Sequence, residues 1–399
     1  HVAGALENAP AVAEEFRQQY RTFVVDEYQD VTPLQQRVLN AGLGDRDDLT
    51  VVGGANQTIY SFTGASPDFL LDFSKTYDNA TVVKLQRDYR STPQVTDLAN
   101  TVIDKAVGRA AGTRLRLEGM RDPGPVPKFH AYESEEIEAK EVAGEILTLL
   151  NQGVAASEIA ILYRTNFQSA VFEEALADAG IVYQVRGGDG FFHRQEIIEA
   201  TRALHRAARR TDLPNDPVAI AKAAFMEIGL SSAEPEGAQA RERWQSLSAL
   251  VDLISTIVRD QPGIDLPGVI VDLQRRASNK QAPTMEGVTL STLHAAKGLE
   301  WDAVFLVGLT EKLLPINQAI KAQDERGDDE AIEEERLLFY VGITRARIHL
   351  LCSWALAKTT GSRASRQRTR FLDGVVPELG DGSAHTSRAS RPKRCRVCN

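Results

Sequence analysis

Two adjacent carboxylates, Asp26 and Glu27, directly follow a short apolar run at residues 22–25. A buried parallel strand of an α/β sheet delivers side chains in this way to its carboxyl edge, where ligands bind. An aspartate at that edge can hold Mg²⁺, and a glutamate beside it can orient or deprotonate a water molecule. Acid pairs are also common in solvated turns, so a functional role for this pair is supported only by the other motifs of the chain.

A second buried strand is predicted at residues 49–52, and it runs into a stretch rich in glycine and amides at residues 53–65. Gln57 in this stretch would lie beside the carboxylates if the two strands are neighbours. Tyr60 and Phe62 follow, and simple packing is the plain alternative for both rings.

A third strand is predicted at residues 81–85 and a helix at residues 94–107. Arg90 lies just ahead of that helix, and anions collect at helix N-termini. A surface arginine paired with an acid is the plain alternative.

The next part of the chain alternates strands and helices between residues 128 and 185, which indicates a parallel sheet with helical crossovers. From residue 195 to about residue 278 strand signals vanish, and amphipathic helices separated by proline and glycine predict an all-helical insertion. The sheet resumes with strands at residues 288–293, 303–307 and 348–353. An acidic, mobile loop is expected at residues 324–330, ahead of a helix at 332–341.

Length and composition limit the class of protein. A chain of 399 residues should form two or three domains, and 43% hydrophobic with 25% charged residues is typical of soluble proteins. No apolar run approaches the ~20 residues of a membrane helix. Without a basic-then-apolar leader, the expected location is the cytoplasm, in association with the nucleoid. The net charge of -9 does not exclude a local basic groove for nucleic acid.

Five sites at element ends therefore carry acids, amides, arginines and aromatic rings. Together they supply a metal-binding acid, a water-orienting base, a phosphate-sensing amide and two arginines, which are the groups that phosphoryl transfer from a nucleotide requires. The sites are Asp26 with Glu27, residues 57–62, Tyr89 with Arg90, residues 294–300, and Arg345.

The motifs VVDEYQD, GGANQTIYSFTGA, LQRDYRSTP, TLHAAKGLEWDAVFLVGL and EEERLLFYVGITRA occur in this order. Their types and order resemble those of the UvrD/Rep/PcrA group of superfamily 1A DNA helicases, from Phe23 to about Ser353. The resemblance implies an α/β fold of two RecA-like P-loop NTPase domains, the first partial and the second complete, with a helical insertion. It also implies ATP and Mg²⁺ as cofactors, single-stranded DNA and DNA junctions as partners, and 3′-to-5′ movement in DNA repair or replication.

The resemblance also implies domain boundaries. Residues 1–84 would be the C-terminal part of the first RecA-like domain, and residues 85–194 with 285–376 the second. Residues 195–284 would be a helical insertion that is short for the family, and residues 377–399 a basic linker that begins a cysteine-rich module.

Residue roles follow by motif. Asp26 would hold Mg²⁺, Glu27 would activate the attacking water, and Gln57 would contact the γ-phosphate. Arg90 and Arg345 would neutralise charge on the γ-phosphate in the transition state. The adenosine contacts would be Tyr89 stacked on adenine, Glu300 on the ribose, and Gly298 beside it.

Single-stranded DNA would be bound by Tyr60, Phe62, Thr63 and His294, because base stacking gives a grip without sequence preference. Two departures from the family pattern bear on this site. Gly54 stands where the family usually has aspartate, and Thr63 stands where many members have arginine. DNA contacts near Phe62 are therefore expected to differ.

The gravest departure concerns the phosphate loop. No glycine in the chain is followed by lysine, so a G-x-x-x-x-G-K-[ST] motif does not occur. In the family this motif precedes the DEYQD strand by a long stretch. The expectation is an N-terminally truncated helicase that, by itself, does not hydrolyse ATP.

The end of the chain carries a C-x-x-C pair, Cys395 and Cys398, after a basic stretch. This resembles an actinobacterial branch of the group, which has a four-cysteine module followed by an HRDC domain. One pair would be an incomplete Zn²⁺ site here, completed only in a longer protein.

Two other functions stay open. One is a degenerate helicase that binds DNA or regulates without catalysis, although intact Glu27 and Arg345 speak against it. The other is the helicase subunit of a RecB/AddA-like helicase–nuclease, although no nuclease-like carboxylate cluster follows Ser353. Protein partners are not readable from the chain.

Overall fold

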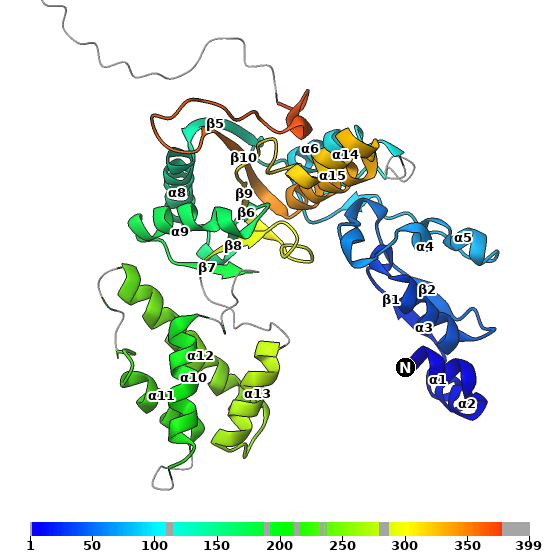
Figure 1. Ribbon diagram of the computed structural model, residues 1–399, viewed down its shortest axis with the longest axis horizontal. Coiled ribbons are helices and arrows are strands. Elements are labelled where there is room, and N and C mark those ends of the chain that lie inside the picture. Colours follow the sequence, from blue (N-terminus) through cyan, green and yellow to red (C-terminus); the bar gives the residue numbers. More distant parts are fainter. Residues whose placement is uncertain are drawn as a thin grey trace, which may run out of the picture.

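The computed structural model describes residues 2–108, 115–186, 192, 194–210, 216–231, 235, 238–278 and 287–376. Cys395 and Cys398 lie outside these residues. The described chain is a mixed α/β structure with parallel sheets and many helices (Figure 1).

The N-terminal part contains a small parallel sheet of β1 (Phe23–Val25) and β2 (Leu49–Val51). Both strands occur where the sequence predicts them, but the expectation that they are buried is wrong. Val24 is 72% exposed, because the structure describes only two strands in this sheet. Helices α1 (Val2–Asn8), α2 (Pro10–Gln19) and α3 (Pro33–Leu43) accompany these strands.

The strand predicted at residues 81–85 is wrong. These residues have no partner strand within the described chain, and Val82, Val83 and Leu85 are 63–73% exposed. The short strand β3 (Arg87–Asp88) follows instead and pairs in parallel with β4 (Glu118–Gly119). Two short helices, α4 (Asp68–Leu71) and α5 (Phe73–Thr76), precede the segment.

The main sheet has six parallel strands in the order β5-β10-β9-β6-β8-β7, which confirms the predicted parallel α/β sheet. Strands from before the helical insertion (β5, β6 and β7) and from after it (β8, β9 and β10) are interleaved, so the two sequence segments form one sheet. The strands are β5 (Lys128–Ser134), β6 (Ile159–Tyr163), β7 (Tyr183–Arg186), β8 (Val288–Thr292), β9 (Trp301–Leu306) and β10 (Ala346–Ala357).

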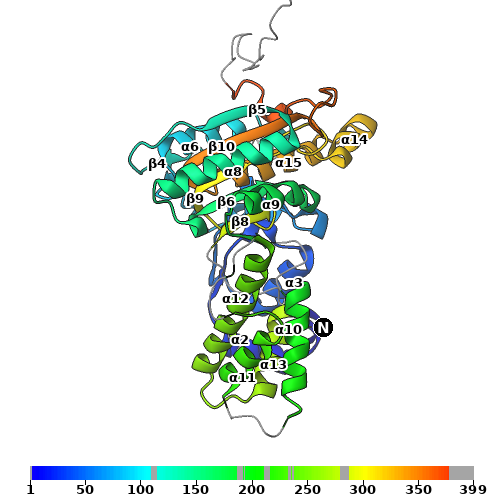
Figure 2. The ribbon, with the colours of Figure 1, turned by 90° about the vertical axis from the view of Figure 1, so that its left-hand side faces the viewer.

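Helices cover both faces of this sheet (Figures 1 and 2). Strand β6 shows why: Ile159, Ile161 and Tyr163 pack with α8 and α9, whereas Ala160 and Leu162 pack with α6 and α15. A strand buried on both faces reads as a continuous apolar run. The covering helices are α6 (Pro93–Ile103), α8 (Glu135–Asn151), α9 (Ser169–Asp178) and α15 (Asp329–Ile343).

The predicted helical insertion lies between β7 and β8 in the sequence. Its helices share a hydrophobic cluster of their own, apart from the two clusters of the main sheet, and both views show them packed together. The domain boundaries at residues 84, 194, 284 and 376 stay a prediction. The helices are α10 (Gln195–Ala207), α11 (Pro217–Met226), α12 (Ala238–Asp260) and α13 (Leu266–Ser278).

The mobile acidic loop expected at residues 324–330 is wrong. Helix α14 (Asn317–Arg326) ends at Gly327, whose φ of 66° is left-handed, and α15 begins two residues later. Asp328 caps α15, since its carboxylate accepts a hydrogen bond from the Glu330 backbone N–H at 3.1 Å. Acidic residues at this point cap and begin a helix, where negative charge is favourable.

None of the helices within the described ranges is both long and apolar enough to cross a bilayer.

Glu138 on α8 ties this helix to the sheet. Its fully buried carboxyl accepts hydrogen bonds from the Gly308 backbone N–H at 2.9 Å and from the Ser353 hydroxyl at 2.5 Å. Burial raises the pKa of Glu138 to about 7, although both hydrogen bonds act in the opposite direction. The folded protein therefore binds this proton more tightly than the unfolded chain does.

The stabilisation from protonated Glu138 is expected to be complete below about pH 4.5 and to be lost as the pH rises through about 7. The shift corresponds to a loss of about 3 kcal/mol in the free energy of unfolding by pH 8. Glu138→Gln should remove this pH dependence, measured by urea unfolding between pH 5 and 8. Glu141→Gln, on the exposed side of the same helix, should keep the wild-type slope. A Glu138→Gln slope equal to the wild-type one would contradict the assignment.

Candidate functional site

The two carboxylates lie at the carboxyl end of β1, as predicted. Glu27 adopts a left-handed conformation, with φ 52° and ψ 38°. Its backbone N–H donates to Asp26 Oδ1 at 2.8 Å. Both side chains are exposed. A left-handed residue other than glycine costs roughly 1–2 kcal/mol, and such strain concentrates at functional sites.

Lys297 is the residue that joins these carboxylates to the far part of the chain. It lies in the turn after β8, and its side chain is only 7% exposed. Its ammonium group lies 3.2 Å from Glu27 Oε2, donates to the Asp30 carboxylate, and donates to the Gln57 carbonyl oxygen at 2.8 Å. No role was predicted for Lys297 or Asp30 from the sequence, although Lys297 lies in the motif TLHAAKGLE and Asp30 ends the motif VVDEYQD.

Gln29 connects the ends of β1 and β2. It is buried, donates to Glu27 Oε2 at 2.5 Å, and accepts from the Gly54 backbone N–H at 3.0 Å. A Cβ added at Gly53 would lie 2.5 Å from Gln29 Oε1, so a larger residue there would displace the Gln29 side chain. Burial raises the pKa of Asp30, and the ammonium of Lys297 only partly offsets this rise.

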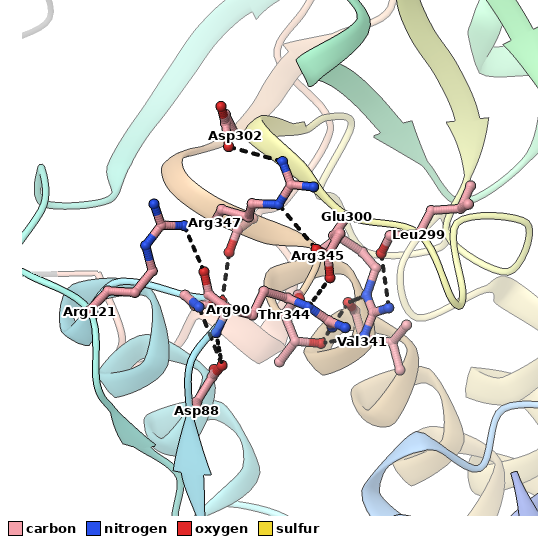
Figure 3. A network of polar contacts seen from close by, with 12 residues as sticks. Asp88, Arg90, Arg121, Leu299, Glu300, Asp302, Val341, Thr344, Arg345 and Arg347 are labelled. Atoms are coloured by element: carbon pink, nitrogen blue, oxygen red, sulfur yellow. Dashed lines mark hydrogen bonds and ion pairs between the residues drawn. The ribbon is translucent and has the colours of Figure 1, made fainter. Parts of the chain in front are cut away.

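The two predicted arginines meet at Thr344 (Figure 3). Arg90 Nη1 approaches the Thr344 carbonyl oxygen at 3.5 Å, and Arg345 Nη2 donates to the Thr344 hydroxyl at 3.1 Å. Arg345 is 2% exposed and also donates to the carbonyl oxygens of Val341 and Leu299, each at 3.0 Å.

The charge of Arg345 depends on its surroundings. Burial and the neighbouring Arg90 lower the pKa of Arg345 to about 10, while Glu27 and Glu300 act in the opposite direction. The guanidinium therefore stays protonated at neutral pH. Glu27, in the N-terminal part, is thus one of the charged groups that act on this arginine.

The Glu300 carboxylate forms ion pairs with two arginine side chains. It forms an ion pair with Arg90 and accepts from Arg347 Nε at 3.2 Å, and Arg347 also contacts Asp302 at 3.1 Å (Figure 3). Burial tends to raise the pKa of Glu300, but the two arginines outweigh it, so the pKa is lowered. No role was predicted for Arg347 from the sequence, although it stands two residues after Arg345.

The adenosine-side residues are less constrained. Gly298 has a left-handed φ of 81°, which suits glycine in this turn. Tyr89 is 69% exposed, and within the described chain its ring has no hydrogen-bond partner or aromatic neighbour. The structure thus does not bring Tyr89 into the network around Arg90.

Three aromatic side chains from distant segments form a cluster. The ring centroids of Tyr60, Phe62 and His294 lie 5.8–6.2 Å apart, and the Tyr60 hydroxyl donates to the His294 carbonyl oxygen at 3.1 Å. Phe62 is 72% exposed. Thr63 donates its hydroxyl to the Tyr60 carbonyl oxygen at 2.8 Å, so it supports the turn.

The electrostatics of the cluster favour ring contacts over ion pairing. Burial, aided by Arg164, lowers the pKa of His294 to about 4, so the imidazole is neutral at pH 7. Burial with the nearby Asp30 and Glu27 raises the pKa of Tyr60. Lys297 Nζ lies 5.3 Å from the Tyr60 ring centroid, within the range of a cation–π contact.

A metal site is only partly built by these residues. In the part of the chain that the structure describes, no group of three or more His, Cys, Asp or Glu side chains could hold a metal ion. The exposed Asp26 carboxylate is nevertheless a hard oxygen donor of the type that Mg²⁺ prefers. Asp26 thus fits Mg²⁺ as a single protein ligand. Water and phosphate would supply the remaining ligands.

Comparison with known proteins identifies the family of the chain. The family model described as the UvrD/REP helicase N-terminal domain matches residues 1–78, and that of the UvrD-like helicase C-terminal domain matches residues 83–229 and 216–357. The chain belongs to the UvrD-like helicases. The resemblance drawn from the five motifs is thereby confirmed at the level of the family.

Individual relatives agree. The chain is 57% identical over 403 residues to ATP-dependent DNA helicase UvrD2 of Mycobacterium tuberculosis, with 100% of this chain and 57% of the relative covered. It is 30% identical to DNA helicase II of Escherichia coli (93% and 61% covered) and 27% identical to ATP-dependent DNA helicase PcrA of Staphylococcus epidermidis (98% and 63%). The chain thus spans about three fifths of the length of these UvrD-like relatives.

A double-mutant cycle tests the Lys297 junction. Lys297→Met and Asp30→Asn should each lower the free energy of unfolding by about 1–3 kcal/mol, because each leaves a partly buried partner unpaired. The double variant should lose less than the sum of the two, by at least about 0.5 kcal/mol. Guanidinium unfolding followed by circular dichroism gives these values. Strict additivity would show that the pair is not energetically coupled.

Proposed function

We propose that this chain is the major part of an ATP-dependent DNA helicase or translocase that moves 3′ to 5′ along single-stranded DNA. The observation that carries the proposal is the junction at Lys297. It brings Glu27 of the N-terminal part toward Arg345 of the main sheet, and the aromatic cluster of Tyr60, Phe62 and His294 lies beside it. The groups for ATP hydrolysis and the rings for DNA binding would thus lie together where the N-terminal part contacts the main-sheet part.

In this proposal each charged group has a task in phosphoryl transfer. Glu27 orients and deprotonates the attacking water, and Asp26 is the residue that would hold Mg²⁺. The bound metal would supply charge neutralisation on the phosphate oxygens. Arg345 and Arg90 would offset the charge that builds on the γ-phosphate, once Arg90 leaves Glu300. Gln57, whose backbone contacts Lys297, would sense the phosphate with its side-chain amide.

The nucleotide cannot be held well by these residues alone. A phosphate loop of the type G-x-x-x-x-G-K-[ST] does not occur in the 399 residues. Backbone N–H groups and a lysine of such a loop normally hold the β- and γ-phosphates. We therefore propose that hydrolysis requires a segment that supplies this loop, and that the 399-residue chain alone is inactive.

The proposed polymer is single-stranded DNA, with junctions as a further substrate in repair or replication. The rings of the cluster are uncharged at pH 7 and Phe62 is exposed, which suits this polymer because stacking on bases is tolerant of sequence. The proposed location is the cytoplasm at the nucleoid. The relatives' names, which are those of DNA helicases, support this proposal.

Hydrolysis of ATP with and without single-stranded DNA tests the central proposal. The 399-residue chain should be inactive, whereas the same chain preceded by a segment that supplies the phosphate loop (the upstream-extended protein) should hydrolyse ATP, and faster when DNA is added. Glu27→Gln in the active form should lower kcat at least about 100-fold, because it removes the general base. Glu330→Gln, an exposed carboxylate on α15, should keep the wild-type rate.

Two outcomes would redirect the proposal. An inactive extended form that still binds DNA would favour the non-catalytic DNA-binding protein. Hydrolysis by the 399-residue chain itself would overturn the role given to the missing phosphate loop.

Phe62 offers a direct test of the DNA site. Phe62→Ala should weaken binding of a fluorescein-labelled oligothymidylate by about 1–3 kcal/mol, the usual value for one stacked base, measured by fluorescence anisotropy. Val126→Ala is a matched control, since Val126 is also exposed (75%) and lies outside the aromatic cluster. Equal affinities of Phe62→Ala and wild type would remove this ring from the DNA site.

A further inference from the structure

Three consecutive glutamates near the start of α15 contact three different parts of the molecule. Neighbouring positions on a helix point about 100° apart, so one run of glutamates can reach in three directions. Glu333 accepts from the Val107 backbone N–H at 3.1 Å. Glu335 pairs with Arg164 at 2.6 Å, and both of these side chains are largely buried.

Glu334 is the member of this run that reaches the N-terminal part of the chain. Its Oε1 accepts from the Ser61 backbone N–H at 3.0 Å, and its Oε2 accepts from the Ser61 hydroxyl. Both donors are neutral, and no cation lies within ion-pair distance of Glu334 in the described residues. The carboxylate thus holds a backbone turn and does not neutralise a charge.

The turn that Glu334 holds carries the exposed ring of the aromatic cluster. Ser61 begins the 3₁₀ turn Ser61–Thr63, and Phe62 is its central residue. On the other side of the turn, Tyr60 is fixed by its hydrogen bond to the His294 carbonyl oxygen. Two contacts from the main-sheet part, one from His294 and one from Glu334, therefore set where Phe62 stands.

The same helix leads to the buried arginine. Helix α15 ends at Ile343, and Arg345 is held there by the Val341 carbonyl oxygen and by Thr344. Glu334 and Ile343, the last residue of the helix, are separated by about 13 Å along the helix axis, at 1.5 Å per residue. Because a packed helix can shift as one body, α15 connects the turn at one end to the residues that hold Arg345 at the other.

We propose that Glu334 is a positioning residue for single-stranded DNA: it fixes the Ser61–Thr63 turn so that Phe62 faces a base beside His294, and it passes the occupancy of that site through α15 to Arg345. This inference rests on the proposed function of the chain. It assigns Glu334 no contact with DNA or nucleotide. Its effect is on geometry and coupling.

The test measures DNA stimulation of ATP hydrolysis in the upstream-extended protein, and oligothymidylate binding by anisotropy. Glu334→Ala should raise the DNA concentration for half-maximal stimulation about three- to tenfold, as expected for loss of hydrogen bonds to a charged group at a partly exposed site. The rate without DNA and the thermal unfolding midpoint should stay at wild-type values.

Two variants provide the controls. Glu334→Gln should stay within about twofold of wild type, because its carbonyl oxygen can accept from the Ser61 N–H and its amide can donate to the Ser61 hydroxyl. Glu330→Ala, one helical turn earlier and exposed, should behave as wild type.

The outcomes separate the two proposals. Glu334→Ala with an unchanged half-maximal DNA concentration would overturn the role of Glu334 while the proposed function stands. Equal losses with and without DNA would show a structural role only and would also overturn it. A wild-type protein that neither binds DNA nor responds to it would overturn the proposed function and this role with it.

Discussion

The ammonium group of Lys297 is the contact on which the arrangement of the candidate site depends. A nearly buried cation is costly unless it is paired and hydrogen-bonded, and here two carboxylates and a carbonyl oxygen satisfy it. All three partners belong to the N-terminal part, whereas Lys297 belongs to the turn after β8. The requirement to satisfy this charge therefore sets that turn against the ends of β1 and β2.

Other features follow from this placement. The same turn contains His294, so the placement of Lys297 also brings the imidazole to Tyr60 and Phe62. The turn ends at Glu300, which meets Arg90 at the start of the main-sheet part. The parallel sheet supplies the stiff support, because β6 and β8 are neighbours whose carboxyl ends point the same way. A single short turn thus brings side chains from separate parts of the sequence together at the candidate site.

The sequence predicted well what depends on local pattern. The alternation of strands and helices between residues 128 and 185 predicted the parallel sheet correctly, because a run of buried apolar residues such as that of β6 is a strong signal. The motif residues were found because their types are unusual at strand ends. The expected strand at residues 81–85 failed because its apolar pattern says nothing about whether a partner strand is available.

Side-chain pairing was beyond the sequence for a physical reason. Lys297 and Asp30 are 267 positions apart, and nothing in local spacing fixes which cation meets which carboxylate over such a separation. The run of glutamates at 333–335 reads as a solvated helix face, yet Glu333 and Glu335 are only 7% and 6% exposed. The acidic stretch at residues 324–330 was predicted to be a loop because the sequence shows its charges. It does not show that Asp328 caps helix α15.

The extended segment at residues 81–85 has a consequence for the behaviour of the chain in solution. Val82, Val83 and Leu85 are exposed on a backbone without a pairing strand in the described structure, which leaves free N–H and C=O groups beside apolar side chains. Such a segment can add to the strand edge of another molecule. Lys84 interrupts the apolar run and opposes this association through its charge. The repulsion that this charge supplies weakens with rising ionic strength, as the charge is screened.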